Sequence, residues 1–213
     1  YHSLLKSTRK QYHQQIARVL EEKFPNTRET QPELLAHHYT EANLIEQAIP
    51  YWEQAGQRAG EHSAYTEAIG HFTRGLELLK TLPDTSARAQ QELTLRLTLG
   101  VPLRAIRSVS APEVKATYIR ARELCQQLGE TRQLFPVLYG LWTFHLVRGE
   151  LLTARELGEQ LLGLAQREQD PALLMEPYWA LGVTLFYLGE LGAAQAHLAQ
   201  GLTLYDSQRH DSH

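Results

Sequence analysis

The sequence predicts an all-α fold, an α-solenoid of antiparallel helix hairpins, on three observations. Residues with high helix propensity (Leu, Ala, Glu, Gln and Arg) dominate, and no segment alternates apolar and polar residues long enough to indicate a strand. Apolar residues instead recur at spacings of three and four. The tripeptide Gly-Glu-Leu at 149–151 returns at 189–191, and an alanine follows three residues later both times. Such a repeated hairpin must stack on copies of itself, because one hairpin alone cannot bury its apolar face.

The apolar periodicity predicts about ten helices joined by short links. Phe24-Pro25-Asn26 ends the first helix, and Pro83-Asp84 ends the fourth. Ser110 is a candidate N-cap for the sixth helix, and Gly129 is the expected C-terminal cap of that helix. The expected helices span residues 5–23, 32–42, 45–60, 65–80, 88–106, 110–128, 132–148, 150–167, 172–188 and 190–205.

The repeat has a period of forty residues. Ala154 and Ala194 occupy the same position after two turns, and Val114 lies forty residues before the first of them. A small residue at this position lets the second helix of a hairpin approach the first closely. Gly149 and Gly189 end the first helices because the turn needs a backbone conformation that other residues adopt at a cost.

The clearest copy of the repeat reads Tyr178-x-x-Leu181-Gly182, then Gly189, Ala194, Leu198, Gly201-Leu202 and Asp206. This pattern resembles the tetratricopeptide repeat family, and the resemblance covers roughly residues 31–206. It implies a superhelix of stacked hairpins. The preceding copy departs from the pattern, since Trp142 sits where a small residue is usual and Gly140 lies two residues earlier. The family's usual period is about 34 residues, so the helices here are longer than its consensus.

The first part of the chain carries a second resemblance. Residues 1–24 together with residues 33–59 look like the junction that follows the nucleotide-binding module in large bacterial signalling ATPases. In that group a nucleotide-cyclase or kinase domain precedes the ATPase module, and a tetratricopeptide array closes the chain. The resemblances imply a junction helix at 1–30 and a repeat domain at 31–206, and the polar residues at 207–213 predict a tail. Because the only methionine is Met175, we expect the chain to be a segment of a longer polypeptide.

Composition argues against nucleic acid and membranes as binding partners. The net charge of −3 and the absence of a basic block argue against nucleic acid and against an anionic membrane surface. The longest nearly unbroken apolar run, residues 137–147, is shorter than the roughly 20 residues that span a bilayer. Cys125 is the only cysteine, so an internal disulfide is impossible, and we expect a cytoplasmic location.

No catalytic, cofactor or metal site is expected in this segment. The string at 75–81, GLELLKT, has leucine where a phosphate-binding loop needs its second glycine. Glu33, His37 and Glu41 share one helix face with His38 adjacent, but metal sites usually draw ligands from more than one element. Cys125 lacks a local catalytic signature. We therefore expect a non-enzyme, and any ATPase or cyclase activity would belong to other parts of the parent polypeptide.

The candidate partner-binding residues lie on the first helices of the last two hairpins. They are Tyr139, Thr143, Leu146 and Val147, which correspond by the period to Trp179, Val183, Phe186 and Tyr187. The family resemblance implies that these positions line a concave groove that holds an extended peptide or a partner helix. The alternative is that several of them stack between neighbouring repeats. Relatives that bind a peptide carboxylate use lysine and asparagine at such positions, so an apolar or helical partner fits this set better.

The predicted function is that of a non-catalytic protein–protein interaction or scaffold domain of a larger cytoplasmic signalling protein, of the ATPase or nucleotide-cyclase type. Its partner would be a protein or peptide bound on the concave face, and an upstream domain of the same polypeptide is one candidate. The alternative is a structural module that self-associates into a homo-oligomer through its exposed terminal repeats.

Overall fold

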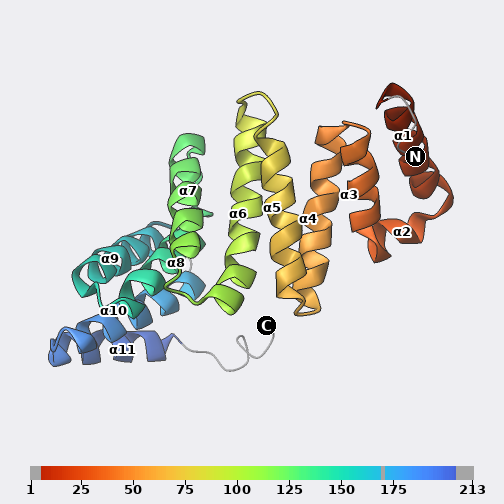
Figure 1. The fold of residues 1–213 in the computed structure, drawn as a ribbon. Coiled ribbons are helices and arrows are strands. Elements are labelled where there is room, and N and C mark those ends of the chain that lie inside the picture. The colour runs from red at the N-terminus through yellow and green to blue at the C-terminus, as the bar shows by residue number, and fades with distance from the viewer. Residues whose placement is uncertain (1–5, 169–170, 205–213) are drawn as a thin grey trace. The chain divides into compact units, whose positions relative to one another are not determined.

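The computed structural model describes residues 6–168 and 171–204, which form helices and turns without any strand. The predicted all-α class and the packing of consecutive helices are confirmed. The tail expected at 207–213 lies outside the described residues. The helices are α1 (Lys6–Lys23), α2 (Pro25–Thr30), α3 (Pro32–Glu41), α4 (Ile45–Glu61), α5 (Tyr65–Leu79), α6 (Ser86–Arg107), α7 (Pro112–Leu128), α8 (Leu134–Val147), α9 (Leu151–Glu168), the 3₁₀ turn η1 (Pro171–Leu173), α10 (Met175–Tyr187) and α11 (Leu191–Thr203) (Figure 1).

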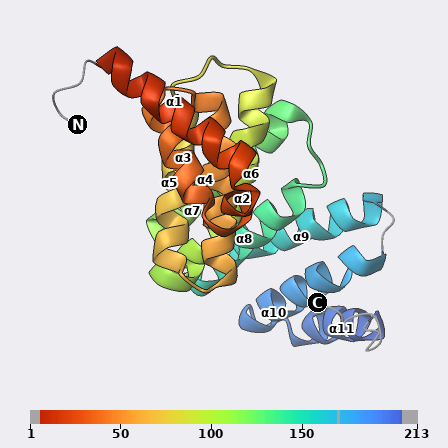
Figure 2. The same ribbon diagram turned by 90° about the vertical axis from the view of Figure 1, so that its right-hand side faces the viewer.

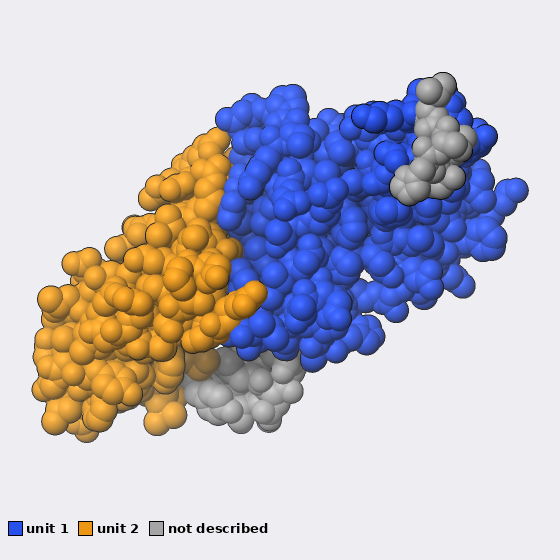
Figure 3. All heavy atoms as spheres, viewed as in Figure 1, with its two compact units in different colours: residues 1–106 blue, residues 107–213 orange. Residues whose placement is uncertain are grey.

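The chain divides into two compact units, residues 1–106 and residues 107–213 (Figure 3). In the first unit, α3 packs on α4, α4 packs on α5, and α1 lies against α3 (Figures 1 and 2). In the second unit, α7 packs on α8, α8 on α9, α9 on α10 and α10 on α11. Within each unit the helices therefore pack chiefly on their neighbours along the chain, as a repeat array requires.

The turns between paired helices use left-handed backbone conformations. Gly129, Gly149 and Gly189 have φ values of 71°, 73° and 80°, which confirms their predicted role as helix terminators. In the first unit, Asn43 and Ser63 adopt the same conformation, with φ values of 62° and 57°. Asparagine tolerates this region better than most residues. The first unit thus makes its turns without glycine, and its repeat is harder to see in the sequence.

Two local expectations need correction. Ser110 is not the N-cap of α7, because that helix begins at Pro112 with Ala111 as its N-cap and no side-chain cap hydrogen bond. The segment after α1 was expected to be a link, yet it contains the short helix α2, which has Pro25 in its first turn. Proline suits that position because the first amide of a helix has no partner within the helix.

The repeat positions pack as the period predicts. Ala154 and Ala194 are 0% and 3% exposed, so each brings its helix close to the preceding one. Gly158 of α9 provides room for the next hairpin, since a Cβ atom there would lie 2.9 Å from Leu181 Cδ2 of α10. Leu162 packs from α9 against the buried cluster formed by Leu181, Leu185 and Ala194. The second hairpin is thus fixed on the first through small-to-large contacts.

Candidate functional site

The predicted partner-binding residues lie on α8 and α10 of the second unit. Four of them are exposed: Val147 by 58%, Trp179 by 46%, Phe186 by 57% and Tyr187 by 63%. The other four, Tyr139, Thr143, Leu146 and Val183, are half-buried. The two helices therefore expose large apolar side chains beside partly buried ones.

Trp142 joins the two helices beneath these residues. Its ring is 1% exposed and lies 5.3 Å from the Tyr139 ring and 5.3 Å from the Trp179 ring, measured between centroids. Its indole Nε1 donates a hydrogen bond of 2.9 Å to Thr184 Oγ1, and this hydroxyl donates in turn to the Ala180 carbonyl oxygen at 2.7 Å. The buried indole therefore fixes Trp179 in place, because its own orientation is set by a satisfied polar contact.

The sequence reasoning missed this role of Trp142. It noted only that a tryptophan stands where the family pattern has a small residue. The forty-residue period makes Trp142 equivalent to Gly182 of the next copy. This difference, the largest side chain in one copy and glycine in the other, was the sequence feature that could have revealed the role of Trp142. A tryptophan ring at a position that holds glycine in the next copy needs space in the adjacent hairpin. The difference between the two copies therefore indicates a contact between two hairpins rather than a contact inside one hairpin.

Charged groups lie at the C-terminus of α8, beside the last of its predicted partner-binding residues. Glu150 Oε1 accepts a hydrogen bond of 2.8 Å from Arg148 Nε, and Glu150 Oε2 lies 2.5 Å from His145 Nδ1. The hydrogen bonds from Arg148 and then from His145 lower the pKa of Glu150. Lys115 of α7 and Arg148 lie over the buried Phe144 ring, at 5.3 Å and 5.6 Å from its centroid. A charged border therefore lies next to the exposed Val147.

The histidines considered as metal ligands take part in a different arrangement. His38 Nδ1 lies 2.8 Å from His13 Nδ1 of α1, and Arg9 approaches Glu41 to 3.9 Å. Within residues 6–168 and 171–204, no group of three or more histidine, cysteine or acidic side chains is placed to hold a metal ion. The structure brings His37 and His38 together with His13, a contact that the sequence reasoning did not foresee.

Cys125 is buried in α7, with 2% of its surface exposed. Burial and then the charge of Glu130 raise its pKa to about 11. Its thiol is therefore protonated at neutral pH, which makes it a poor nucleophile.

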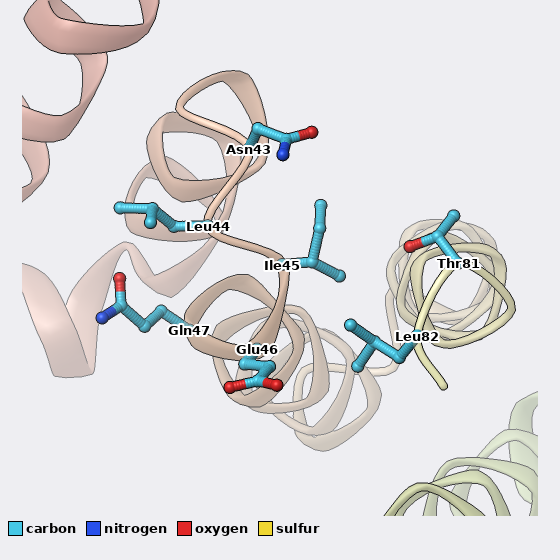
Figure 4. Close-up of a pocket in the computed structure, with 7 residues that line it drawn as sticks. All are labelled: Asn43, Leu44, Ile45, Glu46, Gln47, Thr81 and Leu82. Carbon is cyan, nitrogen blue, oxygen red and sulfur yellow. The ribbon is translucent and has the colours of Figure 1, made fainter. Parts of the chain in front are cut away.

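The first unit carries a hollow of about 460 Å³ at one end of its hairpins (Figure 4). Its walls come from the turn between α3 and α4 and from the residues just after α5. The lining residues are Asn43, Leu44, Ile45, Glu46, Gln47, Thr81 and Leu82. The predicted partner-binding residues lie in the other unit and do not line this hollow.

None of the helices in the described part of the chain has the length and apolar character needed to cross a membrane.

Comparisons with known proteins support the fold. No model of a known protein family matches the chain. An uncharacterized protein, R02095, from Rhizobium meliloti (strain 1021) is 24% identical over 177 residues, which cover 82% of this chain and 17% of that protein. The chain thus spans less than a fifth of the length of this relative. The crystal structure of BtubC (BKLC) from P. vanneervenii superimposes with a TM-score of 0.65 at 14% identity, covering 99% of this chain and 94% of that one. At that identity the likeness shows a shared helical architecture.

Proposed function

We propose that the chain is a protein-interaction array of the tetratricopeptide type, and that α8 and α10 bind an apolar, helical segment of a partner protein. One observation carries the proposal: Trp179, Phe186 and Tyr187 all stand exposed on one helix, at 46% to 63% of their surface. Large aromatic side chains exposed together on one helix favour an interaction site, because leaving them in water is unfavourable.

The surroundings of these rings support a pre-organised site. Trp179 packs edge-on against the buried Trp142, and Phe186 packs against Tyr187 at 5.6 Å between ring centroids. Rings that are already held lose little conformational freedom when a partner binds. The predicted positions carry no lysine or asparagine that could clamp a carboxylate, so the partner contributes apolar side chains rather than a chain terminus.

The proposal extends to the larger protein that would contain this array. The array would serve as the sensor or scaffold arm of a larger cytoplasmic signalling protein with an ATPase or nucleotide-cyclase module. The resemblance of residues 1–24 and 33–59 to the junction in such proteins supports it. So does the much greater length of the bacterial relative. The array itself would carry no catalytic group, and binding would shift how it is disposed toward its upstream module.

A displayed library of amphipathic helical peptides tests the binding site. We expect selected peptides to lose binding by about 30-fold, the equivalent of about 2 kcal/mol, when Phe186 or Trp179 is replaced by alanine. Phe186→Ala separates binding from folding, because this side chain is 57% exposed. Leu152→Ala is the matched control, since Leu152 is 69% exposed on α9. If no selected peptide distinguishes Phe186→Ala from Leu152→Ala, the proposed binding face is wrong.

Self-association is the second candidate function, and α11 favours it. This helix has no acidic residue, lysine or arginine along Leu191–Thr203. It exposes Leu191, Leu198 and Leu202 by 61%, 39% and 74%. Large apolar side chains exposed together on a helix favour an association surface. Light scattering across a concentration series tests this candidate with Leu202→Lys as the variant. A wild-type protein that stays monomeric at high concentration would rule it out.

A further inference from the structure

Helix α1 packs on its neighbours through a face that carries polar side chains and few large apolar ones. The side chains of its buried face include His13, which is 5% exposed, and Ala17, which is fully buried. The apolar residues Tyr12, Ile16 and Val19 point away and are 50%, 42% and 42% exposed. An amphipathic helix normally packs with the opposite orientation. The attachment of α1 to α3 therefore depends strongly on the state of the polar groups between them.

At the middle of this contact two histidines share one hydrogen bond. His13 Nδ1 of α1 and His38 Nδ1 of α3 lie 2.8 Å apart. A hydrogen bond between two imidazoles needs one nitrogen that carries a proton and one that accepts it. When both rings are protonated, both nitrogens are donors and both rings are cationic. The contact is therefore compatible with at most one imidazolium.

The charges around the pair come from both helices. His37 of α3 lies 5.7 Å from the His13 ring and 5.4 Å from the His38 ring, between centroids. Burial lowers the pKa of His13, against the effect of Glu41, and His37 and Arg9 lower it further. Burial lowers the pKa of His38 as well, and His13 and His37 add to this shift. The docked helix therefore favours the neutral form of both rings.

The C-terminal end of α1 is held by a different contact, in which two tyrosine hydroxyl groups donate to one carboxylate. Tyr39 of α3 and Tyr51 of α4 both donate their hydroxyl groups to the Glu21 carboxylate. Their rings stack at 5.6 Å between centroids. Because the ordinary pKa of tyrosine is about 10, both hydroxyls remain donors across the range in which histidine titrates. A change near pH 6 therefore acts on the histidine end of the contact.

We propose that the His13–His38 pair is a pH-sensitive latch, which holds α1 against α3 at neutral pH and releases it in mild acid. The released helix exposes both rings, and exposed imidazole binds a proton with a pKa of about 6.5. The released state then binds more protons than the docked state. The stabilisation from docking is complete above pH 6.5 and is lost as the pH falls below that value. Because at least one of the two rings has to stay neutral in the docked state, the docking equilibrium falls by about tenfold at pH 5.5. This latch lies in the first unit and does not depend on the proposed partner-binding face.

Hydrogen exchange read by mass spectrometry tests the latch on the whole chain. Exchange is measured at about pH 7.5 and pH 5.5 in the presence of EDTA, which excludes a metal effect, and is corrected for the intrinsic pH dependence of amide exchange. We expect protection of the α1 amides to fall by about tenfold in acid, while α9, which contains no histidine, keeps its protection. Equal protection of α1 at both pH values would overturn the proposal.

Variants separate titration from packing. In the double variant His13→Gln with His38→Gln, amide groups can still share a hydrogen bond but do not titrate, so the ratio of α1 protection between the two pH values should return to about one. His62→Gln is the matched control because His62 is exposed in the same unit, and it should keep the wild-type ratio. A pH dependence that survives in the double variant would contradict the latch.

A measurement on the wild-type protein tests the proposal even if α1 does not dock in the double variant. The two imidazoles can be titrated by nuclear magnetic resonance. His13 and His38 should become protonated below pH 6.5, in the same range in which the α1 amides lose protection. Midpoints at or above pH 6.5 for both rings would refute the mechanism.

Discussion

At the scale of single residues, two helical glycines of the second unit have opposite surroundings. A Cβ atom at Gly140 of α8 would lie 2.5 Å from the Tyr118 ring, which is itself 4% exposed and cannot easily move. A Cβ atom at Gly163 of α9 would meet nothing within 4 Å. Gly140 is therefore needed for the close approach of α7 and α8, whereas Gly163 only weakens its helix.

Alanine substitutions should therefore act in opposite directions at these two positions. We expect Gly140→Ala to lower the free energy of unfolding by about 1–3 kcal/mol through overpacking. Gly163→Ala should raise it by about 0.5–1 kcal/mol, because alanine loses less backbone entropy in a helix. Urea unfolding followed by circular dichroism measures both. A Gly140→Ala protein at least as stable as the wild type would show that Tyr118 is not fixed as the structure has it.

The sequence predicted well the roles of residues that depend only on their own backbone conformation. Gly149 and Gly189 were identifiable because a left-handed turn is a property of one residue's own backbone. Trp142 and His13 were not, because their roles depend on which side chain lies opposite in a neighbouring hairpin or helix. Without a fold to place Thr184 or His38, a single sequence does not identify the side chain that Trp142 or His13 meets.

At the scale of helices, the attachment of α1 also predicts a response to alkaline pH. Burial, followed by the hydrogen bond to Glu21, raises the pKa of Tyr51 to about 12 and raises that of Tyr39 as well. The docked helix thus binds these two protons more tightly than the released one does. The stabilisation from this contact is complete below pH 10 and is lost as the pH rises toward 12.

Phenolate absorbance in the ultraviolet measures this prediction. The chain has ten tyrosines, and we expect Tyr39 and Tyr51 to contribute ionisations well above pH 10. Tyr51→Phe should remove one late ionisation, and Tyr39→Phe should remove the other. Tyr65→Phe, on α5, provides a control that should leave both late ionisations in place. If all tyrosines ionise together near pH 10, Glu21 does not hold the two hydroxyls in solution.

Helix ends were predicted less well than the helices themselves. The forty-residue period located the hairpins of the second unit because each copy repeats the same turn glycine and docking alanine. The short helix α2 was missed because its six residues carry no apolar periodicity, and none of them is buried. Ser110 had the right residue type for a cap, yet the chain enters α7 one residue later. Cap geometry depends on the path of the preceding segment, which periodicity does not report.

At the scale of the whole molecule, the period predicted which residues of the candidate site are equivalent, but it did not predict how exposed each of them is. The period indicated that Tyr139 and Trp179 occupy equivalent positions on α8 and α10, and both lie on those helices. They nonetheless differ in exposure, since Tyr139 is half-buried and Trp179 is 46% exposed. Trp142, which packs against both rings, has no counterpart in the next repeat, where Gly182 stands. Equivalent positions in an imperfect repeat therefore need not share a function.

The repeat architecture also determines how far a local perturbation should spread. Within each unit, the main helix contacts among the described residues join elements one or two apart along the chain. Stability in such arrays is approximately a sum of each repeat and its nearest neighbours. Gly140→Ala should therefore reduce hydrogen-exchange protection in α7, α8 and α9, which pack around the altered position. Protection in α3, α4 and α5 should stay within about twofold of the wild type, because these helices belong to the other compact unit. Gly163→Ala, measured in parallel, controls for the introduction of a methyl group at a site with free space. A uniform loss of protection in both units would mean that the chain unfolds as one cooperative body, and the additive description would then fail.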